Sequence, residues 1–149
     1  MERLFAAPLR CGWDRVAIMT YGSLLAGYSR GLLSVADARW YSFRALARLA
    51  AALGPRAGAF VGIVGKGKLG DEPDYLDPDE LGEDVAAARA AGVRDLSLFC
   101  LEGILASAAP ERWLDALVAP RAARPRFSLR GELVHRALVL GARALGAFE

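Results

Sequence analysis

Side chains able to exchange protons or bind polar ligands follow three apolar runs of this chain. They are Tyr21, Ser23, Lys66, Lys68 and Glu102. A carboxylate, a phenol and an ammonium group around one pocket can do acid–base work, so we predict Glu102 and Tyr21 as catalytic residues. The others, with Tyr75 in the loop that follows Lys68, are predicted ligand contacts. The structural alternative is that Glu102 caps the next turn or pairs with Lys66, and that Tyr21 packs with a solvated hydroxyl.

Three short apolar runs precede these side chains and would position them. Each run has the length of a strand in a buried sheet. They cover residues 15–21, 59–64 and 96–101, and a helical pattern follows each run. Alternating strands and helices are typical of a parallel sheet with right-handed crossovers. We therefore predict an α/β fold of three parallel βα repeat units, about three-eighths of a TIM barrel. The alternative is a small open three-layer sheet that needs a fourth strand from residues 1–14 or from a partner chain.

Capping residues mark the two longest internal helices. Ser34 is a predicted N-cap with an acidic residue three positions later, and this helix runs to about Leu53 before a Gly-Pro pair. Asp77 is the predicted N-cap of a helix that begins with proline and ends at Gly92. Both helices lie between predicted strands, as βα units require.

Three further segments complete the expected order. The glycine-containing segment 24–33 is predicted to be a flexible loop, and residues 110–118 a short helix. Ser128 is the predicted cap of a final helix reaching about residue 148. We expect that helix to pack on the sheet, with its arginines reaching outward.

The chain has 149 residues, of which 54% are hydrophobic and 24% charged, a balance typical of one globular domain. We predict a single α/β domain with a lead-in at 1–14, three βα units at 15–118, and a linker with a helix at 119–149. The net charge is only +2 and no basic motif is interleaved with aromatics, so nucleic-acid binding is not expected.

Membrane insertion is not expected either, because no stretch approaches the roughly 20 apolar residues that span a bilayer. A membrane-surface role for residues 121–143 is a less favoured alternative, because any packed surface helix is amphipathic. Two distant cysteines, Cys11 and Cys100, fit neither a disulfide framework nor a zinc site. They favour a reduced, cytoplasmic protein.

No cofactor or metal is predicted. Residues 62–68 match the glycine and lysine spacing of a Walker A loop, but Leu69 stands where magnesium binding requires serine or threonine. The acidic residues between 71 and 79 lack the alternation of an EF-hand. His135 is the single histidine, and it has no evident partner for a triad or a metal site.

The triplet Met19-Thr20-Tyr21 resembles the Met-x-Tyr motif on the sixth barrel strand of family 18 chitinase-like glycoside hydrolases. The resemblance covers residues 15–118, which would correspond to the sixth, seventh and eighth βα units of that barrel. It implies a TIM-barrel fold, a carbohydrate substrate and a site at the carboxyl ends of the strands.

The sequence also departs from that family's pattern. Gly22 stands where the family has an aspartate, and Leu98-Phe99-Cys100 stands where its last strand usually offers a tryptophan. The family's catalytic acid lies on the fourth barrel strand, in a motif that this chain lacks, so Glu102 does not inherit that role.

Two hypotheses follow. In the first, a partial glycoside hydrolase-like barrel binds or hydrolyses a sugar-like ligand, with Tyr21, Trp40 and Tyr75 as candidate stacking aromatics, although Trp40 also fits the helix core. In the second, the chain is a non-catalytic assembly module. Its exposed sheet edges would then pair with a second copy or with another chain that completes the sheet.

Overall fold

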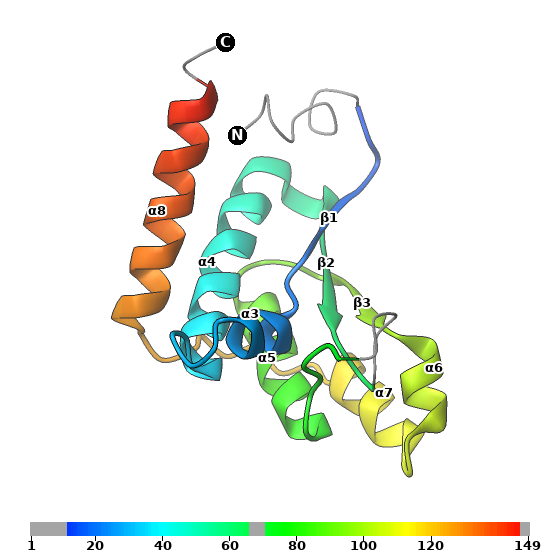
Figure 1. Cartoon of the computed structure of the whole chain (residues 1–149). Coiled ribbons are helices and arrows are strands. Elements are labelled where there is room, and N and C mark those ends of the chain that lie inside the picture. Colours follow the sequence, from blue (N-terminus) through cyan, green and yellow to red (C-terminus); the bar gives the residue numbers. More distant parts are fainter. Residues whose placement is uncertain (1–11, 66–70, 147–149) are drawn as a thin grey trace.

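The computed structural model describes residues 12–65 and 71–146, and these form an α/β fold (Figure 1). Its sheet has three parallel strands, β1 (Val16–Met19), β2 (Ala57–Gly62) and β3 (Asp95–Phe99), in the order β1-β2-β3. The predicted βα repeat is therefore confirmed, as part of a barrel-like arrangement. No strand within 12–65 or 71–146 pairs with the outer side of β1 or β3, and such an edge can pair with another strand.

Six α-helices and one 3₁₀ helix lie within the described residues. They are α3 (Gly22–Tyr28), α4 (Val35–Leu53), η1 (Gly54–Arg56), α5 (Pro78–Ala90), α6 (Leu101–Ala106), α7 (Pro110–Val118) and α8 (Leu129–Gly146). The prediction of a flexible loop at 24–33 was wrong for its first half, because α3 begins directly after β1. No helix in the described ranges is long and apolar enough to cross a membrane.

Local capping explains why the predicted helix starts are correct. The Ser34 hydroxyl accepts a hydrogen bond from the Asp37 amide, and the Asp37 carboxylate accepts one from the Ser34 amide, which is a complete capping box. The Asp77 carboxylate accepts hydrogen bonds from two amides of the first turn of α5. Ser128 accepts a bond from the Gly131 amide at the start of α8. These contacts span three residues or fewer, so the sequence specifies them directly.

Two apolar clusters join the helices to one face of the sheet. Trp40, Phe43 and Leu46 of α4 pack with alternate residues of β2, and Leu81 and Val85 of α5 form a second cluster. Trp113 of α7 closes this second cluster. Each fully buried side chain of this size contributes about 1.5–3 kcal/mol to stability. The core therefore lies between the sheet and α4, α5 and α7.

The opposite face of the sheet is open in the part of the chain that the structure describes. Alternate residues of the strands point to it, and three of them, Met19, Phe60 and Phe99, are large, apolar and exposed, with Met19 72% exposed. Arg15, just before β1, forms an ion pair of 3.0 Å with Asp95 at the start of β3. In a closed barrel this face would be the interior.

The final helix does not pack as predicted. Figure 1 shows α8 beside α4, on the side of α4 that faces away from the strands. Gly131, Glu132 and His135 form its buried side, whereas Leu129, Leu133 and Leu140 are exposed. The expectation that these leucines pack on the sheet was wrong. The side of α8 that contains the small Gly131 and the polar Glu132 packs against α4 instead.

Candidate functional site

An open cleft lies at the carboxyl end of β1, between that strand end, α3 and α4. Its volume is about 500 Å³. Tyrosine rings and small hydroxyl side chains make up much of its lining, together with Met19 and two leucines. The polar members are Thr20, Tyr21, Tyr28, Ser29, Tyr41 and Ser42. We call this site the tyrosine cleft.

Secondary structure explains how the tyrosines meet. Tyr21 lies two residues after the end of β1, and its ring stacks on Phe99 of the far edge strand, with centroids 5.9 Å apart. Tyr28 is the last residue of α3, and Tyr41 lies in α4 next to the buried Trp40. Neighbouring helix residues point about 100° apart, so burial of Trp40 turns Tyr41 toward the cleft.

The cleft tyrosines are neutral hydrogen-bonding groups at neutral pH. Burial raises the pKa of Tyr21, with a smaller contribution from the Cys100 thiol, and burial also raises the pKa of Tyr41. A phenol that stays protonated donates and accepts hydrogen bonds but does not act as a base. No described residue hydrogen-bonds the hydroxyl of Tyr21 or Tyr41. These groups suit recognition of a polar neutral ligand.

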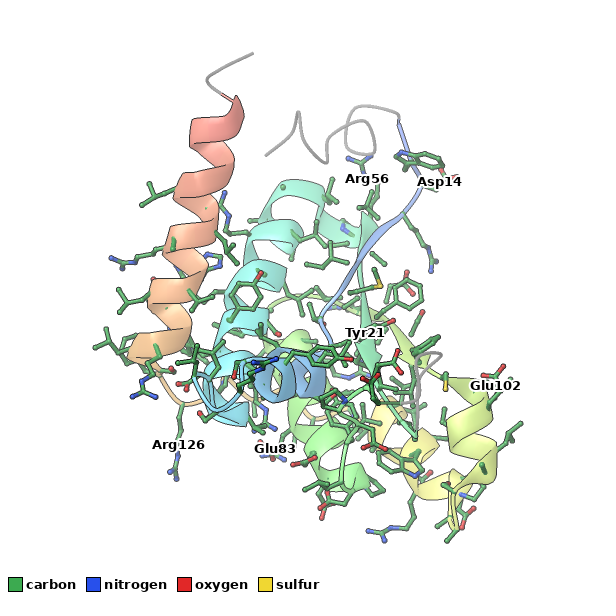
Figure 2. The ribbon with its side chains drawn as sticks, in the orientation of Figure 1. Asp14, Tyr21, Arg56, Glu83, Glu102 and Arg126 are labelled. Atoms are coloured by element: carbon green, nitrogen blue, oxygen red, sulfur yellow. The ribbon has the colours of Figure 1, made fainter. Side chains whose placement is uncertain are left out.

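The other predicted site residues lie elsewhere. Glu102 is exposed in the first turn of α6 and is not part of the cleft lining. Figure 2 shows it on α6, well apart from Tyr21. The expectation that Glu102 ends a strand was wrong, because β3 stops at Phe99 and α6 begins at Leu101. Lys66 and Lys68 lie outside the described residues.

Ser23 and Tyr75 are engaged in holding the fold. The Ser23 hydroxyl donates to the Gly62 carbonyl and accepts from the Ile63 amide, both at 3.2 Å, so it ties α3 to the end of β2. Tyr75 is only 5% exposed, and its hydroxyl donates to Asp84 at 2.8 Å. In this structure the ring of Tyr75 belongs to the core.

A buried carboxylate from α5 reaches the end of β1. Asp84 accepts hydrogen bonds from Tyr75 and from the guanidinium of Arg39 on α4. A Cβ at Gly22 would lie 2.6 Å from Asp84 Oδ2, so the carboxylate occupies the space that a side chain at position 22 would need. Burial raises the pKa of Asp84, while the Arg39 guanidinium opposes this. Asp84 thus lies beside position 22, near the end of β1.

Sequence analysis missed Tyr41, Ser42 and the role of Tyr28. Tyr28 was placed in a predicted loop, and a loop does not define where a side chain points. Tyr41 carried a usable signal, because it sits one position after a residue of the apolar stripe and so must lie at the border of the buried face. Ser42 had no signal that distinguishes it from other serines.

Comparisons of the chain with family models, with curated proteins and with solved structures found no match. The similarity to family 18 barrels therefore stays a prediction that depends on Met19-Thr20-Tyr21 and the order of the βα units.

Proposed function

We propose that the chain binds a neutral, hydroxyl-rich ligand such as a saccharide in the tyrosine cleft. The observation that carries this proposal is the convergence of Tyr21, Tyr28 and Tyr41 on one cleft. Tyrosine offers an apolar ring face and a polar hydroxyl, which match the C–H face and the hydroxyl groups of a sugar ring. The resemblance to carbohydrate-active barrels supports the same class of ligand.

Binding without hydrolysis is the function that fits these residues. Glycoside hydrolysis generally needs at least one carboxylic acid beside the scissile bond to protonate the leaving oxygen, and substrate-assisted enzymes such as those of family 18 do without only the second carboxylate. Among the described residues that line the cleft there is no carboxylate. Glu102 lies apart from Tyr21 on α6, and Asp84 is engaged with Arg39 and Tyr75.

Titration of the purified chain with chito-oligosaccharides and cello-oligosaccharides, followed by NMR chemical shifts, tests this proposal. The variant Tyr41→Phe removes one hydroxyl with little change of shape and should weaken binding between about twofold and tenfold. Glu102→Gln is the matched control, because Glu102 is exposed outside the cleft. The proposal is wrong if no saccharide shifts the cleft resonances at millimolar concentration. Loss of binding in Glu102→Gln alone would move the site to α6.

The open sheet face favours a second function, in which the chain is an assembly module. Met19, Phe60 and Phe99 form an exposed apolar surface between the edges of β1 and β3, which no other described strand pairs with. We propose that a second copy of the chain covers this face, because pairing of edge strands and burial of these side chains would both be favourable.

Sedimentation equilibrium at micromolar concentration tests the assembly. The wild-type chain should be a dimer, and Phe60→Lys should shift it toward a monomer, because a lysine on that face costs far more when buried than when solvated. Leu114→Lys is a control on α7, which packs on the helix side of the fold. A wild-type monomer, or equal dissociation by both variants, would contradict the assembly proposal and leave the cleft proposal standing.

A further inference from the structure

The outward side of α8 is an apolar stripe with nothing on it in the described chain. Leu129, Leu133 and Leu140 recur at helical spacing, and their side chains are between 57% and 64% exposed. Phe127, just before the helix, is also exposed. The buried side of α8 is instead small and polar, since a Cβ at Gly131 would lie 2.4 Å from a backbone oxygen of α4. The leucines are therefore available for contact with another apolar phase.

Positive charge is concentrated in the same part of the sequence. Residues 119–149 contain six arginines and two glutamates, whereas residues 1–118 contain thirteen basic and fifteen acidic side chains. The near-neutral net charge of the whole chain conceals this separation. An exposed apolar stripe beside arginines is typical of helices that lie on anionic bilayers.

A cleft between α4 and α8 contains three arginines, two from residues 119–149 and one from α4. Its volume is about 320 Å³. It is lined by Trp40, Arg44, Arg124, Phe127, Leu129, Glu132, Leu133 and Arg136. We call it the arginine cleft. It contains three guanidinium groups and one carboxylate, so it carries an excess of positive charge, and the exposed Phe127 and Leu129 form part of its wall.

The single carboxylate of the cleft is already occupied by donors. Glu132 accepts hydrogen bonds from Trp40 Nε1 at 3.1 Å and from Arg136 Nε at 2.8 Å, and Arg44 Nε lies 3.1 Å away. The hydrogen bond from Arg136 is the main cause that lowers the pKa of Glu132. Glu132 thus orders two arginines at the cleft, and each still has N–H groups beyond its Nε.

Arg124 is held without a carboxylate partner among the described residues. Its guanidinium carbon lies 5.4 Å from the centroid of the Trp40 ring and 5.5 Å from that of Phe43. Stacking on aromatic rings fixes the plane of a guanidinium while leaving its N–H groups available to an oxyanion. An arginine placed in this way suits the binding of a phosphate.

We propose that the arginine cleft binds the phosphate headgroup of an anionic membrane lipid, and that Phe127, Leu129 and Leu133 insert beside its acyl chains. The adjacency of the guanidinium groups and the apolar side chains in one cleft carries this proposal. A second copy of the chain fits the same surface less well, because a two-fold contact brings identical arginines together. From the sequence, packing of this helix on the sheet was the favoured expectation and a membrane-surface role for residues 121–143 the less favoured alternative. The exposed leucines of α8 now favour that alternative.

Co-sedimentation of the full chain with vesicles tests the proposal. Vesicles of phosphatidylcholine with 30% phosphatidylglycerol should bind the chain, and vesicles of phosphatidylcholine alone should not. Arg124→Gln should reduce partitioning about fivefold, as expected for one basic residue at an anionic surface. Leu133→Gln should reduce it at least as much through lost insertion. Arg94→Gln removes the same charge from an exposed position outside the cleft and should have little effect.

Several outcomes would overturn the proposal. They are absence of binding to anionic vesicles, equal binding to both vesicle types, and equal effects of Arg124→Gln and Arg94→Gln. Full competition by millimolar glycerol phosphate would show that a free phosphate, and not a bilayer, is the ligand. A dimer that dissociates in Leu133→Gln, without vesicle binding, would assign the stripe to a second copy. Circular dichroism of each variant confirms that it is folded.

Discussion

The buried hydrogen bond from Tyr75 to Asp84 is expected to stabilise the fold strongly, and Tyr75→Phe removes it without changing the shape of the ring. The Tyr75 ring is 5% exposed and Asp84 is 9% exposed, so water cannot easily replace the lost donor. A hydrogen bond to a charged group contributes about 1.5–3 kcal/mol. We therefore expect the free energy of unfolding to fall by about that amount at neutral pH.

The stability lost in Tyr75→Phe should depend on pH, and the direction of that dependence follows from the pKa of Asp84. Burial raises the folded-state pKa of Asp84 above its ordinary value of about 3.9. The folded state therefore binds this proton more tightly, and stability falls as pH rises through the interval between the two pKa values. The Tyr75 hydroxyl favours the ionised carboxylate, so its removal raises the folded-state pKa further. The destabilisation in Tyr75→Phe should be larger at pH 7 than at about pH 4.

Urea unfolding followed by circular dichroism at both pH values measures this effect. Tyr41→Phe is the matched control, because it removes a hydroxyl that no described residue hydrogen-bonds. It should change the free energy of unfolding by less than about 0.5 kcal/mol. A loss below about 0.5 kcal/mol in Tyr75→Phe, or a loss that is the same at both pH values, would refute the assigned role of Asp84.

Three further changes test the packing and the pH dependence. Gly22→Ala should destabilise the chain by about 1–3 kcal/mol, because its Cβ would lie 2.6 Å from the fixed carboxylate of Asp84. Gly82→Ala, inside α5 with its nearest neighbouring atom 4.0 Å away, should instead stabilise it by about 0.5–1 kcal/mol. The hydrogen bond from Ser128 is the main cause that lowers the pKa of Asp37, so stability present above about pH 4 should be lost on further acidification. Asp37→Asn should make stability depend less on pH in this acidic range. Urea midpoints measured from pH 5 to pH 2.5 would show whether it does.

The α/β class and most helix starts could be predicted because their causes are local. The capping box at Ser34 and Asp37 and the cap at Asp77 involve residues only two or three positions apart. Five of the six residues of β2 are buried, as a short continuous apolar run predicts for the central strand of a parallel sheet. Chain order then determined that the three strands are parallel, since a helix separates each pair.

The candidate site was predicted only in part. Tyr21 lies in the tyrosine cleft, as its place at the end of a strand indicated. Glu102 does not, because the strand stops at Phe99 and α6 begins at Leu101, inside the predicted strand 96–101. Tyr75 was expected at the surface of a polar loop. Its burial depends on Asp84, nine residues later in the sequence, and on the space that Gly22 leaves beside that carboxylate. Sequence patterns describe residues a few positions apart, so they do not predict a contact of this kind.

What the sequence determined by itself is the order of strands and helices, since capping groups, glycines and apolar periodicity act over a few residues. Only the tertiary structure decided which side of α8 is buried. In α8 the leucine stripe predicts one buried side, yet close approach at Gly131 and the contacts of Trp40 and Arg44 with Glu132 bury the other. The physical reason is that burial depends on the shape and polar groups of the neighbouring element. That neighbour, α4, lies nearly a hundred residues earlier in the chain.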